Sequence, residues 1–124
     1  MATILVVEDE KEYRDLLAKK LEQSGFNVLT ASDGLHGINV LKSNNVDLII
    51  LDLVMPAMDG NRFFYHLRET LKKDIPVIIL TNLTEAAHST AAKDFIVKSN
   101  TNLDEIVQKV KANLPINEEP KTNS

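Results

Sequence analysis

The chain has 124 residues, of which 44% are hydrophobic and 26% charged, and its net charge is -4. This length favours one globular domain with a buried core, while the lack of cysteine excludes disulfides, Cys-ligated zinc and a thiol nucleophile. The acidic balance, the lack of a basic-then-apolar leader and the short apolar runs predict a cytoplasmic protein with no direct nucleic-acid or membrane contact.

The first part of the chain predicts a strand, a helix and a second strand. Residues 3–7 (TILVV) are apolar and largely β-branched, and they end at the acids Glu8 and Asp9. Apolar residues then recur at helical spacing, and Gly25 follows where a helix C-cap is expected. The stripe of this helix consists of Tyr13, Leu16, Leu17 and Leu21. Residues 26–30 (FNVLT) predict the second strand.

A second helix and a third strand follow. Asp33 is a suitable N-cap residue, and the helix that it begins ends near Asn44. Its apolar stripe consists of Leu35, Ile38 and Leu41. The continuous apolar run of residues 48–51 is typical of a parallel strand that is covered on both faces. This strand brings Asp52 to its carboxyl end, and residues 55–60 carry the proline and glycine of a turn.

The next segment predicts a third helix and two more strands. The stripe of the helix after Gly60 consists of Phe63, Phe64, Leu67 and Leu71. Residues 75–81 (IPVIILT) form a strand that ends in Thr81, and residues 94–98 (DFIVK) form a strand that ends in Lys98. The periodicity of residues 82–92 is weak, and eleven residues wound as an α-helix rise only about 16 Å. We therefore expect the fourth crossover to contain no full helix.

The chain ends in a helix and a polar segment. Asn102 and Glu105 have the spacing of a capping box for an amphipathic helix. Its inward residues are Leu103, Ile106, Val107, Val110 and Leu114. The polar composition of residues 115–124 predicts a disordered tail, so the folded domain is expected to span residues 1–114.

Strands separated by crossovers predict an α/β fold with a doubly wound five-stranded parallel sheet, helices on both faces, and a fourth helix that is short or absent. The carboxyl ends of parallel strands share one edge, where ligands bind. Five polar residues should meet there: Glu8, Asp9, Asp52, Thr81 and Lys98. Clustered carboxylates repel one another, and an open site of oxygen ligands suits Mg²⁺, or alternatively Mn²⁺.

Two motifs resemble signatures of one family, the CheY-like receiver domain of two-component response regulators. These are ILVVEDE at residues 4–10 and LDLVMPAMDG at residues 51–60, followed in order by Thr81 and Lys98. The resemblance covers about residues 3–114 and implies a flavodoxin-like sheet of strand order 2-1-3-4-5. A signalling switch follows from it, with at most self-phosphorylation and autodephosphorylation activity, rather than a metabolic enzyme.

The resemblance also implies a role for each site residue. Asp52 would be the phosphoacceptor, and it would hold Mg²⁺ together with Glu8, Asp9 and the backbone carbonyl of Val54. The phosphoryl group would be contacted by two residues, Lys98 and the hydroxyl of Thr81. The aromatic switch position is matched by Phe95.

The partners implied are a sensor histidine kinase, or a small phosphodonor, and an effector protein or a second copy of the chain. We expect docking on the face formed by the fourth crossover, the last strand and the last helix. A shortened crossover would leave the sheet thinly covered near Ile78, Leu80 and Ile96, and an exposed apolar patch indicates a binding surface.

Two alternatives remain at this point. A pseudo-receiver would keep the fold as an interaction module without phosphorylation, as suggested by Ser99 after Lys98 and Asn82 after Thr81, where the family usually has proline and a small residue. A haloacid-dehalogenase-type phosphatase needs a second aspartate two residues after the nucleophile, where this chain has Val54.

Overall fold

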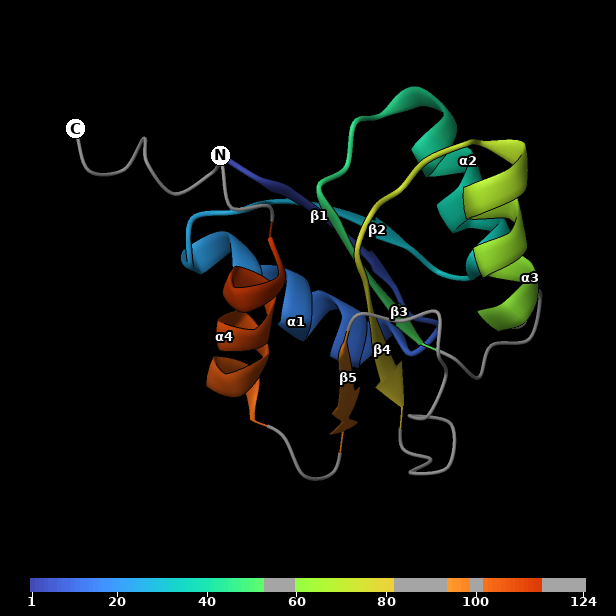
Figure 1. Cartoon of the computed structure of the whole chain (residues 1–124). Helices are drawn as coiled ribbons and strands as arrows, with labels where there is room; N and C mark the ends of the chain where they lie inside the picture. Colours follow the sequence, from blue (N-terminus) through green and yellow to red (C-terminus); the bar gives the residue numbers. More distant parts are fainter. Residues whose placement is uncertain (53–59, 82–93, 99–101, 115–124) are drawn as a thin grey trace.

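The computed structural model describes residues 1–52, 60–81, 94–98 and 102–114. Five parallel strands form one sheet in the order β2-β1-β3-β4-β5 (Figure 1). Their bounds are β1 (Thr3–Val7), β2 (Asn27–Ala31), β3 (Leu48–Asp52), β4 (Val77–Thr81) and β5 (Asp94–Val97). The predicted doubly wound sheet and its strand order are therefore confirmed.

The helices cover both faces of the sheet. One face packs against α1 (Lys11–Gln23) and α4 (Leu103–Asn113), and the other packs against α2 (Gly34–Ser43) and α3 (Gly60–Tyr65), as Figure 1 shows. Alternate residues of one strand serve the two cores: Ile4 and Val6 pack toward α1 and α4, whereas Leu5 and Val7 pack toward α2 and α3. Both cores are fully apolar, which explains why β1 and β3 have continuous rather than alternating hydrophobic sequences.

The predicted helix ends are largely confirmed. Gly25 has φ = 100°, a left-handed conformation that favours glycine after a helix C-terminus. The Asp33 carboxylate accepts a hydrogen bond of 2.8 Å from the backbone N–H of His36 and caps α2. At the start of α4, Asn102 and Glu105 each accept from the other's backbone N–H, which is the capping box expected from their spacing.

Four predicted strand boundaries are displaced by one or two residues. β2 spans Asn27–Ala31 rather than residues 26–30, and β5 ends at Val97 rather than at Lys98. β4 begins two residues later than predicted, at Val77, because Pro76 has no N–H to donate. The carbonyl of Pro76 still accepts a 3.0 Å hydrogen bond from the N–H of Ile49, so the segment joins the sheet through its acceptor only.

The third helix differs from the prediction in its second half. α3 continues as a five-residue π-helical segment, η1 (His66–Thr70), in which the N–H of Leu71 donates to the carbonyl of His66 at 2.9 Å. This segment ends at Thr70, and Lys72 just beyond it has φ = 56°. Hydrophobic periodicity could not show the wider turn, because the buried stripe of Phe63, Phe64 and Leu67 is the same in both cases.

Two residues assigned to apolar helix stripes lie on the surface. Leu16 of α1 is 54% exposed and Leu35 of α2 is 55% exposed. Each lies beside the stripe rather than on it, because the contact with the sheet is narrow: Leu17 and Leu21 are fully buried in α1, as is Leu41 in α2.

The expectation of thin cover near Ile78, Leu80 and Ile96 is wrong. All three side chains are buried in the core that α1 and α4 form with the sheet. The prediction assigned these side chains to the wrong face of the sheet. Adjacent residues of a strand point in opposite directions. Phe95 pairs with Ile79 across β4 and β5 and points to the other side, where it is 43% exposed.

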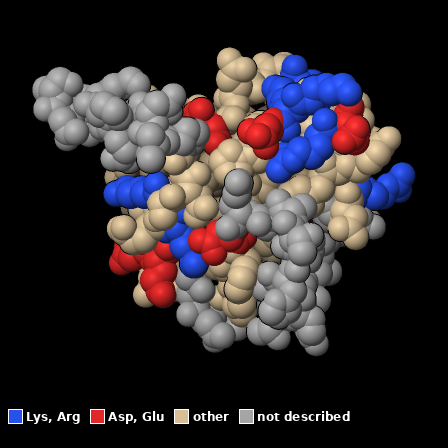
Figure 2. Space-filling model, in the orientation of Figure 1, with Lys and Arg blue, Asp and Glu red and all other residues tan. Residues whose placement is uncertain are grey.

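Other expectations concern segments outside the described residues, namely the form of residues 82–92 and the tail at 115–124. In the described part of the chain, no helix has both the length and the apolar character required to span a bilayer. Acidic and basic side chains are intermingled on the face that Figure 2 presents, in keeping with the small net charge.

At Gly37, α2 packs closely against Val7 of β1 and Phe63 of α3. A Cβ atom added there would lie 3.0 Å from Cγ2 of Val7 and 3.2 Å from Cε1 of Phe63. Gly37→Ala should gain about 1 kcal/mol of helix propensity but lose about 1–3 kcal/mol to overpacking. We expect urea denaturation to show a net loss of roughly 1 kcal/mol. Asn39→Ala, on the exposed face of α2, is the matched control and should be neutral or slightly stabilising. A Gly37→Ala protein as stable as the parent would show that the helix can move away from the sheet.

The Asp94 carboxylate links the start of β5 to the last turns of α4 through hydrogen bonds. Its carboxylate accepts from Nζ of Lys109 at 3.1 Å, from Nδ2 of Asn113 at 3.2 Å, and from the N–H of Phe95 at 2.8 Å. Burial alone would raise the pKa of Asp94, but these hydrogen bonds and the Lys109 charge hold it below its usual value of 3.8. The folded protein thus binds this proton less readily than the unfolded chain, so the stabilisation is present above the unfolded pKa and is lost as pH falls through the folded pKa.

We therefore expect Asp94→Asn to lower the free energy of unfolding near neutral pH by about 1 kcal/mol, a value discounted for partial exposure. The difference from the parent should shrink as the pH falls below the usual aspartate pKa, in denaturation curves recorded at several pH values. Asp104→Asn provides a control in the same helix. Its ion pair with Lys20 is mostly exposed on the aspartate side, so a loss of at most about 0.5 kcal/mol is expected. A pH-independent effect of Asp94→Asn would contradict the assignment.

Candidate functional site

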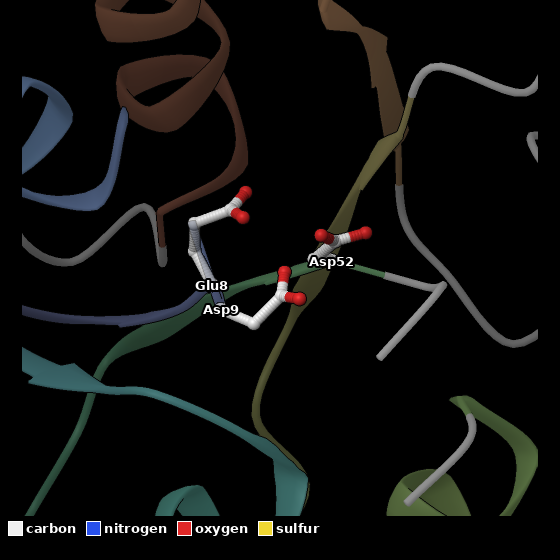
Figure 3. Close-up of side chains that lie close together, drawn as sticks. All are labelled: Glu8, Asp9 and Asp52. Carbon is white, nitrogen blue, oxygen red and sulfur yellow. The ribbon is translucent and has the colours of Figure 1, made fainter. Parts of the chain in front are cut away.

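Three carboxylates meet at the carboxyl edge of the sheet. Glu8 and Asp9 directly follow β1, and Asp52 is the last residue of β3, which is the strand next to β1. One oxygen from each residue can be chosen so that all three lie within 4.8 Å of one another, and Figure 3 shows the side chains converging between the two strand ends. The gathering of acids predicted from the strand order is confirmed.

The cluster is buried on one side and open on the other. Glu8 is fully buried and Asp52 nearly so, whereas Asp9 is exposed. The backbone holds Glu8 in place, since its N–H donates to the carbonyl of Ala31 at 3.0 Å and its carbonyl accepts from Nη1 of Arg14 at 2.9 Å. Burial of ionised carboxylates is costly without partners, so cations and hydrogen-bond donors are required at this edge.

Lys98, the residue after β5, supplies the ammonium. Its Nζ lies 2.6 Å from Oε1 of Glu8 and 3.6 Å from Oδ2 of Asp52. A third and longer contact, 3.7 Å, joins it to the exposed carboxylate of Glu10. Burial would lower the pKa of Lys98, but the hydrogen bond to Glu8 and the charges of Asp52, Glu8 and Glu10 outweigh it and raise the pKa. Lys98 is therefore a permanent cation in this site.

Tyr13 also belongs to the site, although the sequence placed it only in a helix stripe. The ring lies under Lys98, with Nζ 4.8 Å from the ring centroid. Its hydroxyl oxygen is buried and has no hydrogen-bond partner among the described residues. Burial raises the pKa of Tyr13. The charge of Lys98 opposes this shift, and the charges of Glu8 and Glu10 add to it. Helical periodicity predicts only that this residue points inward. The one feature of the sequence that could have placed it in the site is an aromatic side chain one turn after the acids.

The other predicted site residues are only partly described. Thr81 ends β4 and pairs with Val97, so its backbone lies at the expected edge, but its side chain is outside the described atoms. Val54 is also outside the described residues. Phe95 lies within β5 with its ring partly exposed to solvent.

The donor set fits a hard divalent cation. Among the described residues, the metal-ligating groups that converge are the carboxylates of Glu8, Asp9 and Asp52, and such ligands suit Mg²⁺ better than zinc. Both oxygens of Glu8 already have partners, because Oε1 contacts Lys98 and Oε2 accepts from the N–H of Glu10 at 2.8 Å. The exposed Asp9 leaves the outer side of the cluster accessible to water, which Mg²⁺ usually retains.

The sequence matches known proteins along most of its length. The family model described as the response regulator receiver domain matches residues 4–111. The phosphate regulon transcriptional regulatory protein PhoB of Escherichia coli is 39% identical over 115 residues, which is 88% of this chain. The chain spans only 50% of PhoB, so it corresponds to about half the length of this relative.

Two solved structures have a similar fold. Response regulator protein TrrA of Thermotoga maritima, in complex with Mg²⁺-BeF, has a TM-score of 0.80 and 36% identity, and the match covers 90% of this chain and 98% of TrrA. TrrA in complex with histidine kinase ThkA matches with a TM-score of 0.78 and 36% identity, over 90% of this chain and 97% of that one.

Proposed function

The chain belongs to the family of response regulator receiver domains, and on this basis we propose that it is a phosphorylation-dependent signalling switch whose phosphoacceptor is Asp52. The observation that carries the proposal is the position of Asp52. Its carboxylate lies at a strand end beside two other acids and 3.6 Å from the Lys98 ammonium. That arrangement gives a nucleophilic oxygen, a set of metal ligands and a fixed positive charge in one place.

In the proposed reaction, an oxygen of Asp52 attacks the phosphorus atom of the donor. A new P–O bond forms as the bond to the leaving group breaks, and the product is an aspartyl phosphate. Lys98 would stay beside the phosphoryl oxygens and offset their charge, and the Thr81 hydroxyl would donate to one of them. Mg²⁺, held by Glu8, Asp9, Asp52 and the carbonyl of Val54, would supply further positive charge when bound; Mn²⁺ has the same ligand preference.

The switch itself would use the exposed aromatic ring. A dianionic group on Asp52 can draw the Thr81 hydroxyl toward it, which leaves room for Phe95 to turn inward from its present, partly exposed position. The affected surface lies along β4 and β5. An effector protein, or a second copy of the chain, would dock there, on the face that includes the last helix.

We propose a sensor histidine kinase as the main phosphodonor, with small phosphodonors as a second source. The complex of the similar TrrA with a histidine kinase supports this choice. The family match across residues 4–111 does not favour the pseudo-receiver alternative. In this proposal residues 1–114 form the receiver unit, residues 115–124 are a polar tail, and the protein acts in the cytoplasm.

The test is chemical labelling of Asp52. The protein is incubated with acetyl phosphate and excess Mg²⁺, and its intact mass is compared with that of Asp52→Asn. We expect one acid-labile phosphoryl adduct on the parent and none on the variant. Asp15→Asn is the matched control, since Asp15 is an exposed carboxylate of α1 paired with Lys11, and it should retain the adduct. No adduct on the parent, with donor and metal in excess, would reject the proposed function.

A further inference from the structure

The ring of Tyr13 contacts the Lys98 ammonium of the site. It projects from the first turn of α1, which begins just after the acids, and the Lys98 ammonium lies 4.8 Å from the ring centroid. This separation is within the range in which a cation is attracted to the negative face of an aromatic ring. The attraction is stronger where water is excluded, and Lys98 has only 11% of its side chain exposed.

The hydroxyl does not explain why this side chain is here. It is buried without a hydrogen-bond partner among the described residues, which is an unfavourable arrangement for a polar group. The ring, by contrast, packs against the core between α1, α4 and the sheet and presents a face to Lys98. The part of Tyr13 that interacts favourably with the site is therefore the ring.

We propose that Tyr13 is a positioning residue that holds the Lys98 ammonium beside Asp52. The inference rests on the proposed function, because it concerns how Lys98 is kept in reach of a phosphoryl group on Asp52. The ring face holds the ammonium in place, which the carboxylates can do only in part.

The reason is a change of charge at the acids. Without metal, Lys98 is attracted by Glu8 at 2.6 Å and by Asp52 at 3.6 Å. A divalent cation among the same carboxylates offsets their charge and repels the ammonium. The quadrupole of the Tyr13 ring is unaffected by this neutralisation, so the ring becomes relatively more important when the metal is present. An aliphatic side chain could fill the same space but would not attract the ammonium.

Two substitutions separate the ring from the hydroxyl and from simple packing. Tyr13→Phe keeps the aromatic face and removes the unpartnered hydroxyl, whereas Tyr13→Leu keeps an apolar side chain and removes the face. The first readout is the NMR shift of the Lys98 Hε protons, assigned by comparison with Lys98→Arg and recorded with and without Mg²⁺. The second is the initial rate of phosphorylation by acetyl phosphate at saturating Mg²⁺. Thermal unfolding of each variant confirms that it is folded.

We expect an upfield ring-current shift of the Lys98 Hε protons in the parent and in Tyr13→Phe, retained in Mg²⁺ and lost in Tyr13→Leu. The rate should be close to that of the parent in Tyr13→Phe and about threefold to tenfold lower in Tyr13→Leu, as a cation–π contact of ordinary strength implies. A merely structural role would slow Tyr13→Leu, but the Hε shift of the parent would then be lost in Mg²⁺, because nothing would keep the ammonium at the ring.

Two results would overturn the inference. One is the absence of the Hε shift in the parent in Mg²⁺, and the other is a folded Tyr13→Leu protein that is phosphorylated at the parental rate. The failure of the proposed function looks different. In that case the parent takes up no phosphoryl group, while an Hε shift that persists in Mg²⁺ still shows that the ring holds Lys98.

Discussion

Replacement of Lys98 by methionine is expected to lower the free energy of unfolding by about 3 kcal/mol in metal-free buffer, the lower end of the range for breaking a buried ion pair. Methionine preserves most of the length of the side chain and its contact with Tyr13 but removes the ammonium. Glu8, fully buried, then loses the cation at 2.6 Å, and the repulsion between the three carboxylates is no longer offset. Urea denaturation in the presence of a chelator measures the loss.

The double variant Glu8→Gln/Lys98→Met tests the cause. Glutamine is uncharged and can still accept from the N–H of Glu10 through its carbonyl oxygen, so only the charge of Glu8 is removed. We expect the double variant to regain most of the stability lost in Lys98→Met, with a coupling energy between the sites of about 1–3 kcal/mol. If the losses of stability in Glu8→Gln and in Lys98→Met simply add in the double variant, the 2.6 Å contact contributes little. Lys98 would then stabilise the fold by packing alone.

The second large effect is a reversal of the relative stability of the parent and Asp52→Asn on addition of Mg²⁺. Without metal, the substitution removes one of three crowded negative charges, and Lys98 retains its shorter contact with Glu8. We expect Asp52→Asn to be more stable by about 1–2 kcal/mol. With Mg²⁺ at a hundredfold excess over its Kd, the parent should gain about 2.7 kcal/mol and become the more stable protein. The variant should gain much less, because it lacks one ligand.

Thermal unfolding of both proteins, in chelator and in a Mg²⁺ series, measures the reversal. A change of 1 kcal/mol corresponds to roughly 3–6 °C in Tm for a domain of this size. Asp15→Asn, which alters an exposed carboxylate outside the cluster, should follow the parent in both buffers. If Asp52→Asn has the lower Tm in chelator and Mg²⁺ does not change the Tm of the parent, the metal-site hypothesis is wrong.

Most of the sheet and four of the site residues, namely Glu8, Asp9, Asp52 and Lys98, could be predicted from sequence because they depend on local patterns or on the order of parallel strands. The continuous apolar run before Asp52 predicts a strand covered on both faces, and β3 is fully buried as expected. The capping box of α4 needs only Asn102 and Glu105 at the correct spacing. Glu8, Asp9 and Asp52 gather because adjacent parallel strands end at one edge, which follows from topology and not from side-chain detail.

The features that could not be predicted from sequence depend on which way a side chain points and on contacts between residues of different helices and strands. The prediction of an exposed patch failed because Ile78 and Leu80 face α1 and α4, and a continuous apolar strand does not reveal which residues face which layer. The same limitation applies to Tyr13, which joins the site only because β5 delivers Lys98 above its ring. The π-helical turn of η1 leaves no periodic signal over five residues.

The contact between Lys98 and Glu8 also bears on how the domain is made. Glu8 follows the first strand and Lys98 follows the last, so the pair joins nearly the two ends of the folded chain. A ribosome produces the chain from its N-terminus, and Glu8, Asp9 and Asp52 are synthesised long before Lys98. Until Lys98 emerges, the acids have no access to its ammonium, and neither β5 nor α4 is available to the fold. Neither the site nor the five-stranded sheet can therefore be complete before residues 94–98 have been synthesised.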